Sequence, residues 1–362
     1  MFVYVGSRTT KERNARGRGI NVYRMNTESG CWSHVQLVGD LANPSFLATD
    51  RSRRFLYSVH GDFSEISAFA IDAGTGRLTF INRQSTCGKN PVHLAIDNTN
   101  RFAMVANYAT GTLAVLPRNP DGSLGPVAQL VELPGTPGPH KVQQASSHPH
   151  HLPFDPAGRF ILVPDKGLDR IFIFAFDAST GKLAPAEMPF VTSREGSAPR
   201  HVAFHPSAPY AYVINELNST ITAYRYTAER GRLEPVQIIP SLPDTFFGEN
   251  TGAEIAVAPS GSFLYASNRG HDSIGVFAID QGSGRITPVG WESTQGDGPR
   301  FFALDPSGHF LYAANENSDT IFPFRVDSAT GKLSPAGGVI ATGSPVCIIF
   351  SANEYRGIDF HA

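Results

Sequence analysis

The sequence carries little charge of either sign. Asp, Glu, Lys and Arg together make up 17% of its 362 residues, and the formal net charge is −2. About 25% charged residues is usual for a soluble protein. A chain so close to neutrality has no basic field that would recruit nucleic acid or an anionic membrane surface. We therefore expect neither of these as a partner.

Cysteines and long apolar runs are also scarce. The cysteines are Cys31, Cys87 and Cys347, and none forms a CxxC pair, so their spacing argues against a zinc site or a disulfide framework. No segment approaches the ~20 apolar residues that a membrane-spanning helix needs. The first residues lack the basic leader and apolar stretch of a signal peptide. We expect a cytoplasmic protein whose cysteines are reduced and buried.

Glycine turns, in contrast, are abundant and regularly spaced. A tight turn such as TGRL, TGKL or SGRI recurs seven times, and a small apolar strand follows each copy. The intervals between the turn glycines are 46, 46, 59, 50, 53 and 47 residues. A repeat of this length is typical of propellers and solenoids. The glycines are Gly30, Gly76, Gly122, Gly181, Gly231, Gly284 and Gly331.

A second pattern runs half a repeat out of phase. Each copy is a strand, a turn rich in Asp, Pro, Ser and Gly, and another strand, as in PRFFALDPSGHFLYAANE from Pro299. With one strand before the glycine turn and one after it, each repeat supplies four antiparallel strands. The seventh copy is split between PVCIIF near Cys347 and FVYVGS from Phe2. Pairing of these terminal strands closes a ring and protects the strand edges. We predict an all-β, seven-bladed β-propeller that forms a single domain over residues 1–362.

Antiparallel geometry also places the candidate site. The first strand of each repeat begins, and the second ends, on the face that receives the long connections between blades. A purely structural position should carry a similar residue in every repeat, yet these positions carry different charged and aromatic residues. The difference favours a functional site at the mouth of the central channel. The residues concerned include His93, His150, His151, Arg200, His201, Glu216, Glu254, Arg269 and Arg300.

Three connections on that face are notable. The segments 131–151 and 241–254 are enlarged, and we expect them to form walls or a lid that excludes water. The loop 8–19 holds five Arg and Lys residues against a single acid. We expect it to add a positive rim that attracts an anionic substrate.

Several segments match a known pattern: YVGS at Tyr4, SHPHHLPFDPAGRF at Ser147, VINELNSTITAY at Val213 and ASNRGHDSIGVF at Ala266. In these segments the chain resembles the seven-bladed lactonase family, which contains cycloisomerase-type 6-phosphogluconolactonases and 3-carboxy-cis,cis-muconate cyclase. The resemblance covers nearly the whole chain. It implies a site without a metal or another cofactor, acting on a small anionic lactone or carboxylate.

The resemblance also implies a catalytic group. The second histidine of HPH is His150, the arginine of the PR motif is Arg200, the glutamate of the NE motif is Glu216, and the arginine of NRGHDS is Arg269. All four lie in the positions that antiparallel geometry places at the channel mouth.

From the same positions we expect Arg300, Glu254, His151 and His93 to bind the substrate. Two features depart from the family pattern. His151 replaces the small residue that usually follows HPH, and SVHGD at Ser58 lacks the usual N-E pair. Both departures are expected to alter the pocket.

The expected reaction is hydrolysis of an anionic sugar lactone such as 6-phosphogluconolactone. Glu216 or His150 would activate water and the other would handle the leaving-group proton. Arg200 would stabilise the oxyanion. Arg269 and Arg300 would bind a phosphate or carboxylate through paired hydrogen bonds.

Three alternatives stay open at this point. The same arginines suit a lactonising cyclase that acts on a carboxymuconate-type dicarboxylate. Many propellers are interaction platforms without enzymatic activity, because fold alone does not define function. Oxygen ligands for calcium are offered by Glu254, Asn107, Asn215, Asn268 and Asn315.

Overall fold

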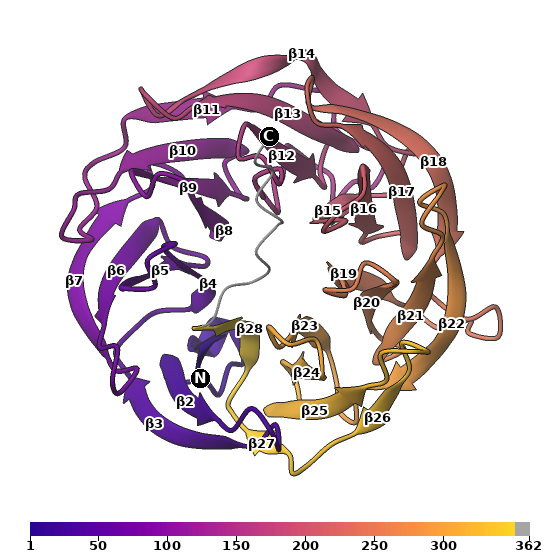
Figure 1. Cartoon of the computed structure of the whole chain (residues 1–362). Helices are drawn as coiled ribbons and strands as arrows, with labels where there is room; N and C mark the ends of the chain where they lie inside the picture. The colour runs from indigo at the N-terminus through magenta and orange to yellow at the C-terminus, as the bar shows by residue number, and fades with distance from the viewer. Residues whose placement is uncertain (352–362) are drawn as a thin grey trace.

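The computed structural model describes residues 1–351 as seven antiparallel sheets arranged around a central axis (Figure 1). The predicted all-β, seven-bladed propeller is confirmed. Within residues 1–351 there is no α-helix, and the one short 3-10 helix is η1 (Lys11–Arg13). No helix in this range has the length and apolarity required to cross a membrane. The last residues of the predicted domain, 352–362, lie outside the described residues.

The blades are numbered along the chain, and their strands are given from the axis outward (Figure 1). Blade 1 contains β28 (Pro345–Phe350), β1 (Phe2–Ser7), β2 (Ile20–Met25) and β3 (Trp32–Val38). Blade 2 contains β4 (Pro44–Thr49), β5 (Phe55–His60), β6 (Glu65–Ile71) and β7 (Leu78–Ser85). Blade 3 contains β8 (Pro91–Ile96), β9 (Phe102–Asn107), β10 (Thr112–Pro117) and β11 (Gln129–Glu132).

The remaining blades follow the same order. Blade 4 contains β12 (Phe160–Asp165), β13 (Arg170–Asp177) and β14 (Lys182–Thr192). Blade 5 contains β15 (Pro199–Phe204), β16 (Tyr210–Asn215), β17 (Thr220–Thr227) and β18 (Arg232–Pro240). Blade 6 contains β19 (Thr251–Val257), β20 (Phe263–Arg269), β21 (Ser273–Ile279) and β22 (Ile286–Ser293). Blade 7 contains β23 (Pro299–Leu304), β24 (Phe310–Asn315), β25 (Thr320–Val326), β26 (Leu333–Pro335) and the short β27 (Ile340–Ala341).

The ring closes as the split repeat predicts. β28 pairs antiparallel with β1, with Tyr4 opposite Ile349. Blade 4 differs from the other blades because its innermost segment forms only two isolated bridges, Pro149–Asp165 and Phe154–Ile161. Proline has no backbone N–H for a strand ladder, and Pro149 and Pro153 both lie in this segment.

We call the face where the first strands begin the mouth face, and the opposite face the turn face. The seven turn glycines lie on the turn face, and each packs on an aromatic ring of the preceding blade. Gly284 has φ +69, and a Cβ at this position would lie 2.3 Å from the Tyr210 ring. Its carbonyl accepts a hydrogen bond of 3.1 Å from the Tyr212 hydroxyl. Gly30 packs in the same way on Phe310 and so joins blade 1 to blade 7.

The turns between first and second strands are built from a repeated aspartate. Asp305 Oδ1 accepts the N–H of Phe310 at 2.8 Å, and Asp155 Oδ1 accepts the N–H groups of Arg159 and Phe160 at 2.7 and 2.9 Å. Asp50 and Asp97 do the same in their blades. These turns are therefore structural, as the sequence indicates.

The core lies between neighbouring blades. Tyr265 and Val276 of blade 6 pack with Phe302 and Leu311 of blade 7 in one buried cluster, and similar clusters follow around the ring. Burial of a side chain of this size contributes about 1.5–3 kcal/mol. The rigid ring that results holds the mouth face in place.

One prediction about the cysteines is wrong. Cys347 is buried in β28, but Cys31 and Cys87 are exposed, and all are free thiols. Cys31 follows the turn glycine Gly30, and Cys87 lies at φ +53 in the connection after β7. Turns and connections run over the surface, so neither cysteine reaches the core.

Candidate active site

β-Bulges at the start of the first strands shape the mouth face. In β15 the register shifts between Pro199 and His201, so that Arg200 has no partner in β16. Arg300 takes the same place in β23. A bulge re-aims the side chain of its extra residue, and bulges are common beside active sites. The repeated bulge therefore presents an arginine in blades 5 and 7 but Ser45 and Val92 in blades 2 and 3.

The bulged residues line a small cavity at the axis. Atoms leave about 300 Å³ unfilled there, a volume that includes space open to solvent. Its lining includes His150 and Arg200 on one side and Arg300 on another. The full lining is Arg8, Ser45, Phe46, Val92, His150, Arg200, His201, Arg300, Phe301 and Val346.

Beside Arg200, a buried glutamate collects three cations. Glu216 Oε1 lies 2.7 Å from Lys166 Nζ and 3.4 Å from an Nη atom of Arg269. Glu216 Oε2 lies 3.2 Å from Arg200 Nε. The arginines are fixed further by backbone carbonyls, because Arg200 donates to Ala253 and Arg269 donates to Gly252. The sequence prediction brings Arg200, Glu216 and Arg269 into one cluster, and the structure places them so.

The cluster fixes the charge of Glu216. Burial raises its pKa, but the charges of Arg269, Lys166 and Arg200 overcome this effect and hold the pKa far below its usual value. Burial and the charges of Arg300 and Arg269 lower the pKa of Arg200 to about 9. Both groups remain charged at neutral pH. Glu216 is thus an anion that orients cations.

A chain of hydrogen bonds leads from a second glutamate to the cavity. Glu254 Oε1 lies 2.9 Å from His201 Nδ1, and His201 Nε2 lies 3.1 Å from His150 Nδ1. The same Glu254 oxygen accepts the N–H of Ile255 at 3.0 Å. Within residues 1–351, His150 Nε2 has no hydrogen-bond partner. This pattern assigns the proton of each histidine to Nδ1 and leaves a lone pair on His150 Nε2.

His150 and His201, the two histidines of this hydrogen-bonded series, are neutral. Burial and the charge of Arg200 lower the pKa values of both His150 and His201 well below their usual value. Burial raises the pKa of Glu254 to about 7. A neutral imidazole accepts a proton, and an ionised carboxylate behind it favours that uptake.

Two more predicted site residues, His151 and His93, pack against the hydrogen-bonded histidines. The His151 ring stacks on His201 with centroids 4.3 Å apart, and His93 meets His151 edge-on at 4.1 Å. The structure places His151, His93 and Glu254 behind the cavity wall, where they contact its histidines. Arg300, the fourth residue predicted to bind substrate, lines the cavity itself.

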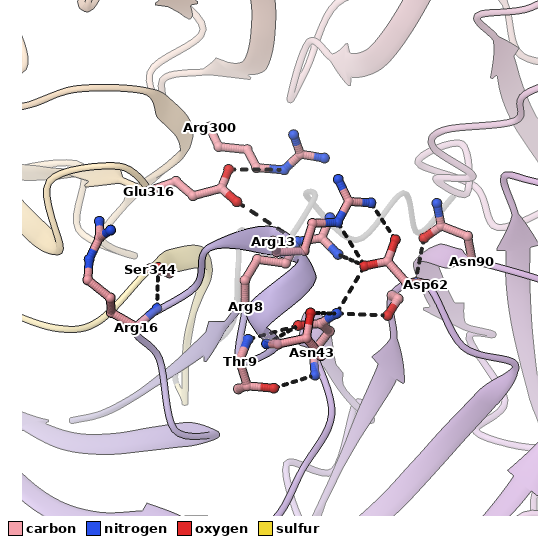
Figure 2. Close-up of polar contacts among 12 residues, drawn as sticks. Arg8, Thr9, Arg13, Arg16, Asn43, Asp62, Asn90, Arg300, Glu316 and Ser344 are labelled. Carbon is pink, nitrogen blue, oxygen red and sulfur yellow. Dashed lines mark hydrogen bonds and ion pairs between the residues drawn. The ribbon is translucent and has the colours of Figure 1, made fainter.

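A further charged cluster surrounds Arg8 (Figure 2). Arg8 Nη1 lies 3.6 Å from Asp62, and Arg8 Nε lies 4.0 Å from Glu316. The other Glu316 oxygen lies 3.9 Å from Arg300 Nε. Arg13 also points to Asp62 and donates from Nε at 2.8 Å. The loop that follows β1 therefore brings Arg8 into the cavity wall, and Arg13 remains at the surface in an ion pair.

The enlarged connection 131–151 also reaches the site. Gln143 Oε1 accepts a hydrogen bond of 2.8 Å from Lys166 Nζ. His148 stacks on Tyr108 at 4.4 Å, and the Tyr108 ring lies edge-on to His150. The connection thus covers one side of the cluster around Glu216.

The strand-end asparagines hold strands and the connections between blades together. Asn215 donates to Thr220 and Thr222, and Asn268 donates to the Ser241 carbonyl. Within residues 1–351, no group of three or more His, Cys, Asp or Glu side chains is arranged to hold a metal ion.

The predicted catalytic and substrate-binding residues do not include three residues of this site, although His201 is among the mouth positions noted from the sequence. Lys166 follows the second strand of its blade, as Glu216 does. His201 follows Arg200 as His151 follows His150, and Arg8 is the first residue of the basic loop. Each occupies a channel-mouth position in the repeat, which is the signal that could have found it. The individual contacts depend on side-chain packing between blades, which the repeat does not encode.

Comparisons with known proteins agree with this geometry. A family model described as "Lactonase, 7-bladed beta-propeller" matches residues 2–350. The 6-phosphogluconolactonase of Bacillus subtilis (strain 168) is 34% identical over 311 residues, which cover 83% of this chain and 84% of the relative. The 6-phosphogluconolactonase of Formosa agariphila is 34% identical over 325 residues, covering 84% and 86%. The solved structure of the Pseudomonas aeruginosa periplasmic gluconolactonase has a TM-score of 0.89 and 29% identity, covering 97% of this chain and 99% of that chain.

The chain therefore belongs to the seven-bladed β-propeller lactonase family. It is a lactonase of the 6-phosphogluconolactonase-like kind, and the family and enzyme class expected from the sequence are confirmed.

Proposed function

We propose that this lactonase hydrolyses an anionic sugar lactone, with 6-phosphogluconolactone as the preferred candidate. The main supporting observation is that Arg200 and a neutral His150 line the same cavity, and that His150 Nε2 is free to accept a proton. The proposal also draws on the names of two relatives, which are 6-phosphogluconolactonases. A cytoplasmic location stays a prediction.

In the first step His150 acts as the general base. Its Nε2 takes a proton from a water molecule as the water oxygen attacks the lactone carbonyl carbon. The Glu254–His201 pair holds the His150 ring and favours the positive charge that develops on it. We assign the base role to His150 because Glu216, the other candidate, is too strongly stabilised as an anion by its three cations. Positioned acid–base groups of this kind contribute about 10²–10⁴-fold in rate.

The reaction also requires a group that stabilises the negative charge on the carbonyl oxygen. As water adds, the carbonyl oxygen becomes an oxyanion, and Arg200 is placed to stabilise it with a charge that is already oriented. Glu216 and the carbonyl of Ala253 hold the Arg200 guanidinium in place. When the ring C–O bond breaks, the leaving alkoxide takes the proton from His150. The product is the open-chain acid, and His150 returns to its neutral form.

A substrate panel tests this proposal. We expect wild-type enzyme to hydrolyse 6-phosphoglucono-δ-lactone, read by a pH indicator after subtraction of the spontaneous rate. The panel includes glucono-δ-lactone and a carboxymuconate, because turnover of the latter alone would establish the cyclase alternative. His150→Gln should reduce kcat by about 10²–10⁴-fold with little change in Tm. A His150→Gln enzyme within tenfold of wild type would remove His150 from the base role.

A further inference from the structure

Arg8 is a buried cation whose hydrogen-bonding capacity is only partly used. It follows β1 directly and is 4% exposed. Its Nε and Nη1 atoms are buried and have no hydrogen-bond partner within residues 1–351. The carboxylates of Asp62 and Glu316 lie 3.6 and 4.0 Å away, beyond hydrogen-bond length. Buried polar groups are almost always satisfied, so these donors indicate a missing acceptor.

Blade 2 provides the space that Arg8 occupies. Other blades place a large side chain at the end of the second strand, such as Tyr108, Glu216 or Arg269. Blade 2 has Gly61 there, and a Cβ at this position would lie 2.4 Å from Arg8 Nη1. A guanidinium from blade 1 thus fills a position that blade 2 leaves open.

Arg300 faces the same part of the cavity. Arg8 and Arg300 both line it, and Glu316 lies between them at 4.0 and 3.9 Å (Figure 2). Burial and the charge of Arg300 lower the pKa of Arg8 to about 10. Glu316 supplies one negative charge to these two cations, but at distances beyond hydrogen-bond length. An anion that accepts hydrogen bonds from both guanidinium groups would stabilise them further.

The charge balance around the cavity favours a doubly charged anion. The cations are Arg8, Arg13, Arg300, Arg200, Arg269 and Lys166, and the carboxylates beside them are Asp62, Glu316, Glu216 and Glu254. Cations therefore outnumber these carboxylates by two. A phosphate monoester carries about −1.5 to −2 at pH 7 and offers three acceptor oxygens. A single carboxylate supplies half the charge.

We propose that Arg8 and Arg300 form the subsite that binds the phosphoryl group of a phosphorylated sugar lactone. This inference rests on the proposed lactonase reaction and assigns its substrate specificity. The arginines lie in blades 1 and 7, whereas His150 and Arg200 lie in blades 4 and 5, across the cavity. A substrate with its phosphoryl group at one end and its lactone carbonyl at the other would contact both pairs.

Selectivity between two substrates tests the subsite. We expect wild-type kcat/KM to be at least about tenfold higher for 6-phosphoglucono-δ-lactone than for glucono-δ-lactone. In Arg8→Met this preference should fall by about 10–100-fold, which is the weight of one or two charge-assisted hydrogen bonds. Arg8→Lys keeps the charge but loses the paired donors, so its preference for the phosphorylated lactone should lie between those of wild type and Arg8→Met. Arg16→Met, from the same loop and ion-paired with Asp319 at the surface, is the matched control and should keep the wild-type preference.

Phosphate binding to the wild-type enzyme tests the subsite without relying on a variant that folds correctly. Inorganic phosphate should inhibit wild-type turnover competitively and raise its Tm, and both effects should weaken at least fivefold in Arg300→Met or Arg8→Lys. Equal losses on both lactones in Arg8→Met, or absence of phosphate inhibition in wild type, would overturn the subsite and leave the lactonase proposal intact. Absence of turnover with both lactones would instead refute the proposed function.

Discussion

The two faces of the propeller are formed by the ends of the same strands, but residues repeat between blades on the turn face and vary between blades on the mouth face. On the turn face, blade after blade repeats one solution, with a glycine such as Gly284 packed on a neighbouring ring and an aspartate such as Asp305 accepting N–H groups. On the mouth face, equivalent positions hold a histidine in one blade and an arginine in the next. The comparison teaches that repetition marks positions that build the ring, whereas variation marks the positions at which we propose ligand contact.

The faces also differ in how well their polar groups are satisfied. Asp305 uses both carboxylate oxygens in its own turn, and Asp155 uses one there and accepts the Tyr226 hydroxyl of blade 5 with the other. At the mouth, Arg8 and Arg200 keep buried nitrogen atoms without hydrogen-bond partners among residues 1–351. Departures from local satisfaction concentrate at functional sites. The ligand site that we propose therefore lies where the fold leaves buried donors unsatisfied.

The largest expected effect comes from Glu216→Gln at the mouth. It leaves Lys166, Arg200 and Arg269 without their shared carboxylate, and removal of one partner from a buried ion pair costs about 3–5 kcal/mol. We expect a loss of this size in the free energy of unfolding in urea, together with loss of turnover. Glu234→Gln, in an exposed pair with Arg232, should cost less than about 1 kcal/mol. Equal stability of the two variants would contradict the role of Glu216.

On the turn face, Gly284→Ala should reduce stability and leave catalysis unchanged. Alanine must adopt the left-handed backbone that Gly284 has, and its Cβ meets the Tyr210 ring at 2.3 Å, which should cost about 1–3 kcal/mol. Urea unfolding measures the loss, and kcat at low temperature should match that of wild type. Gly290→Ala is the control, because a Cβ there has nothing within 4 Å. A kcat that falls with stability would show that the faces are coupled.

The pH profile sharpens the role of Glu254. Its pKa is about 7, and its ionised form favours proton uptake at His150, so kcat/KM should rise as pH increases through about 7. In Glu254→Gln the plateau should fall by about tenfold, and the acid limb should move below pH 6.5 because the pKa of His150 is well below that value.

Stability should respond to the same titration with the opposite sign. A carboxyl whose pKa is raised in the fold stabilises it below the unfolded-state value and loses this contribution as pH rises through about 7. The Tm of Glu254→Gln relative to wild type should therefore increase between pH 5 and pH 8. A pH-independent difference would show that Glu254 is not buried with a raised pKa.

The smallest effect is expected from His205→Asp on the turn face. His205 accepts the N–H of Ala208 at 2.8 Å, where other blades use an aspartate oxygen. Aspartate should take over this role but lose the hydrogen bond of 3.0 Å from His205 Nε2 to the Gly261 carbonyl, so we expect a loss of about 1 kcal/mol and full activity. The matched exchange at the mouth, His150→Asp, should abolish turnover. Loss of activity in His205→Asp would break the rule that turn-face residues are interchangeable between blades.

Sequence reasoning succeeds where local chemistry repeats. The spacing of turn glycines and the split seventh unit predict the ring, because a left-handed turn and a strand pair are set by few residues. Antiparallel geometry also predicts that Arg200, Glu216 and Arg269 meet. It does not predict that Lys166 joins them or that His201 links Glu254 to His150, because these contacts cross between blades and depend on side-chain packing.

The junction of β1 with β28 sets the order in which the pocket can be assembled. Arg8 follows β1, and its N–H binds the carbonyl of Ser344 at 3.0 Å, so its place in the cavity exists only once the last strand has docked. Contacts between the two ends of a chain are among the slowest to form. During synthesis β1 must wait for β28, and the nascent chain gains its complete binding pocket only when these two strands pair.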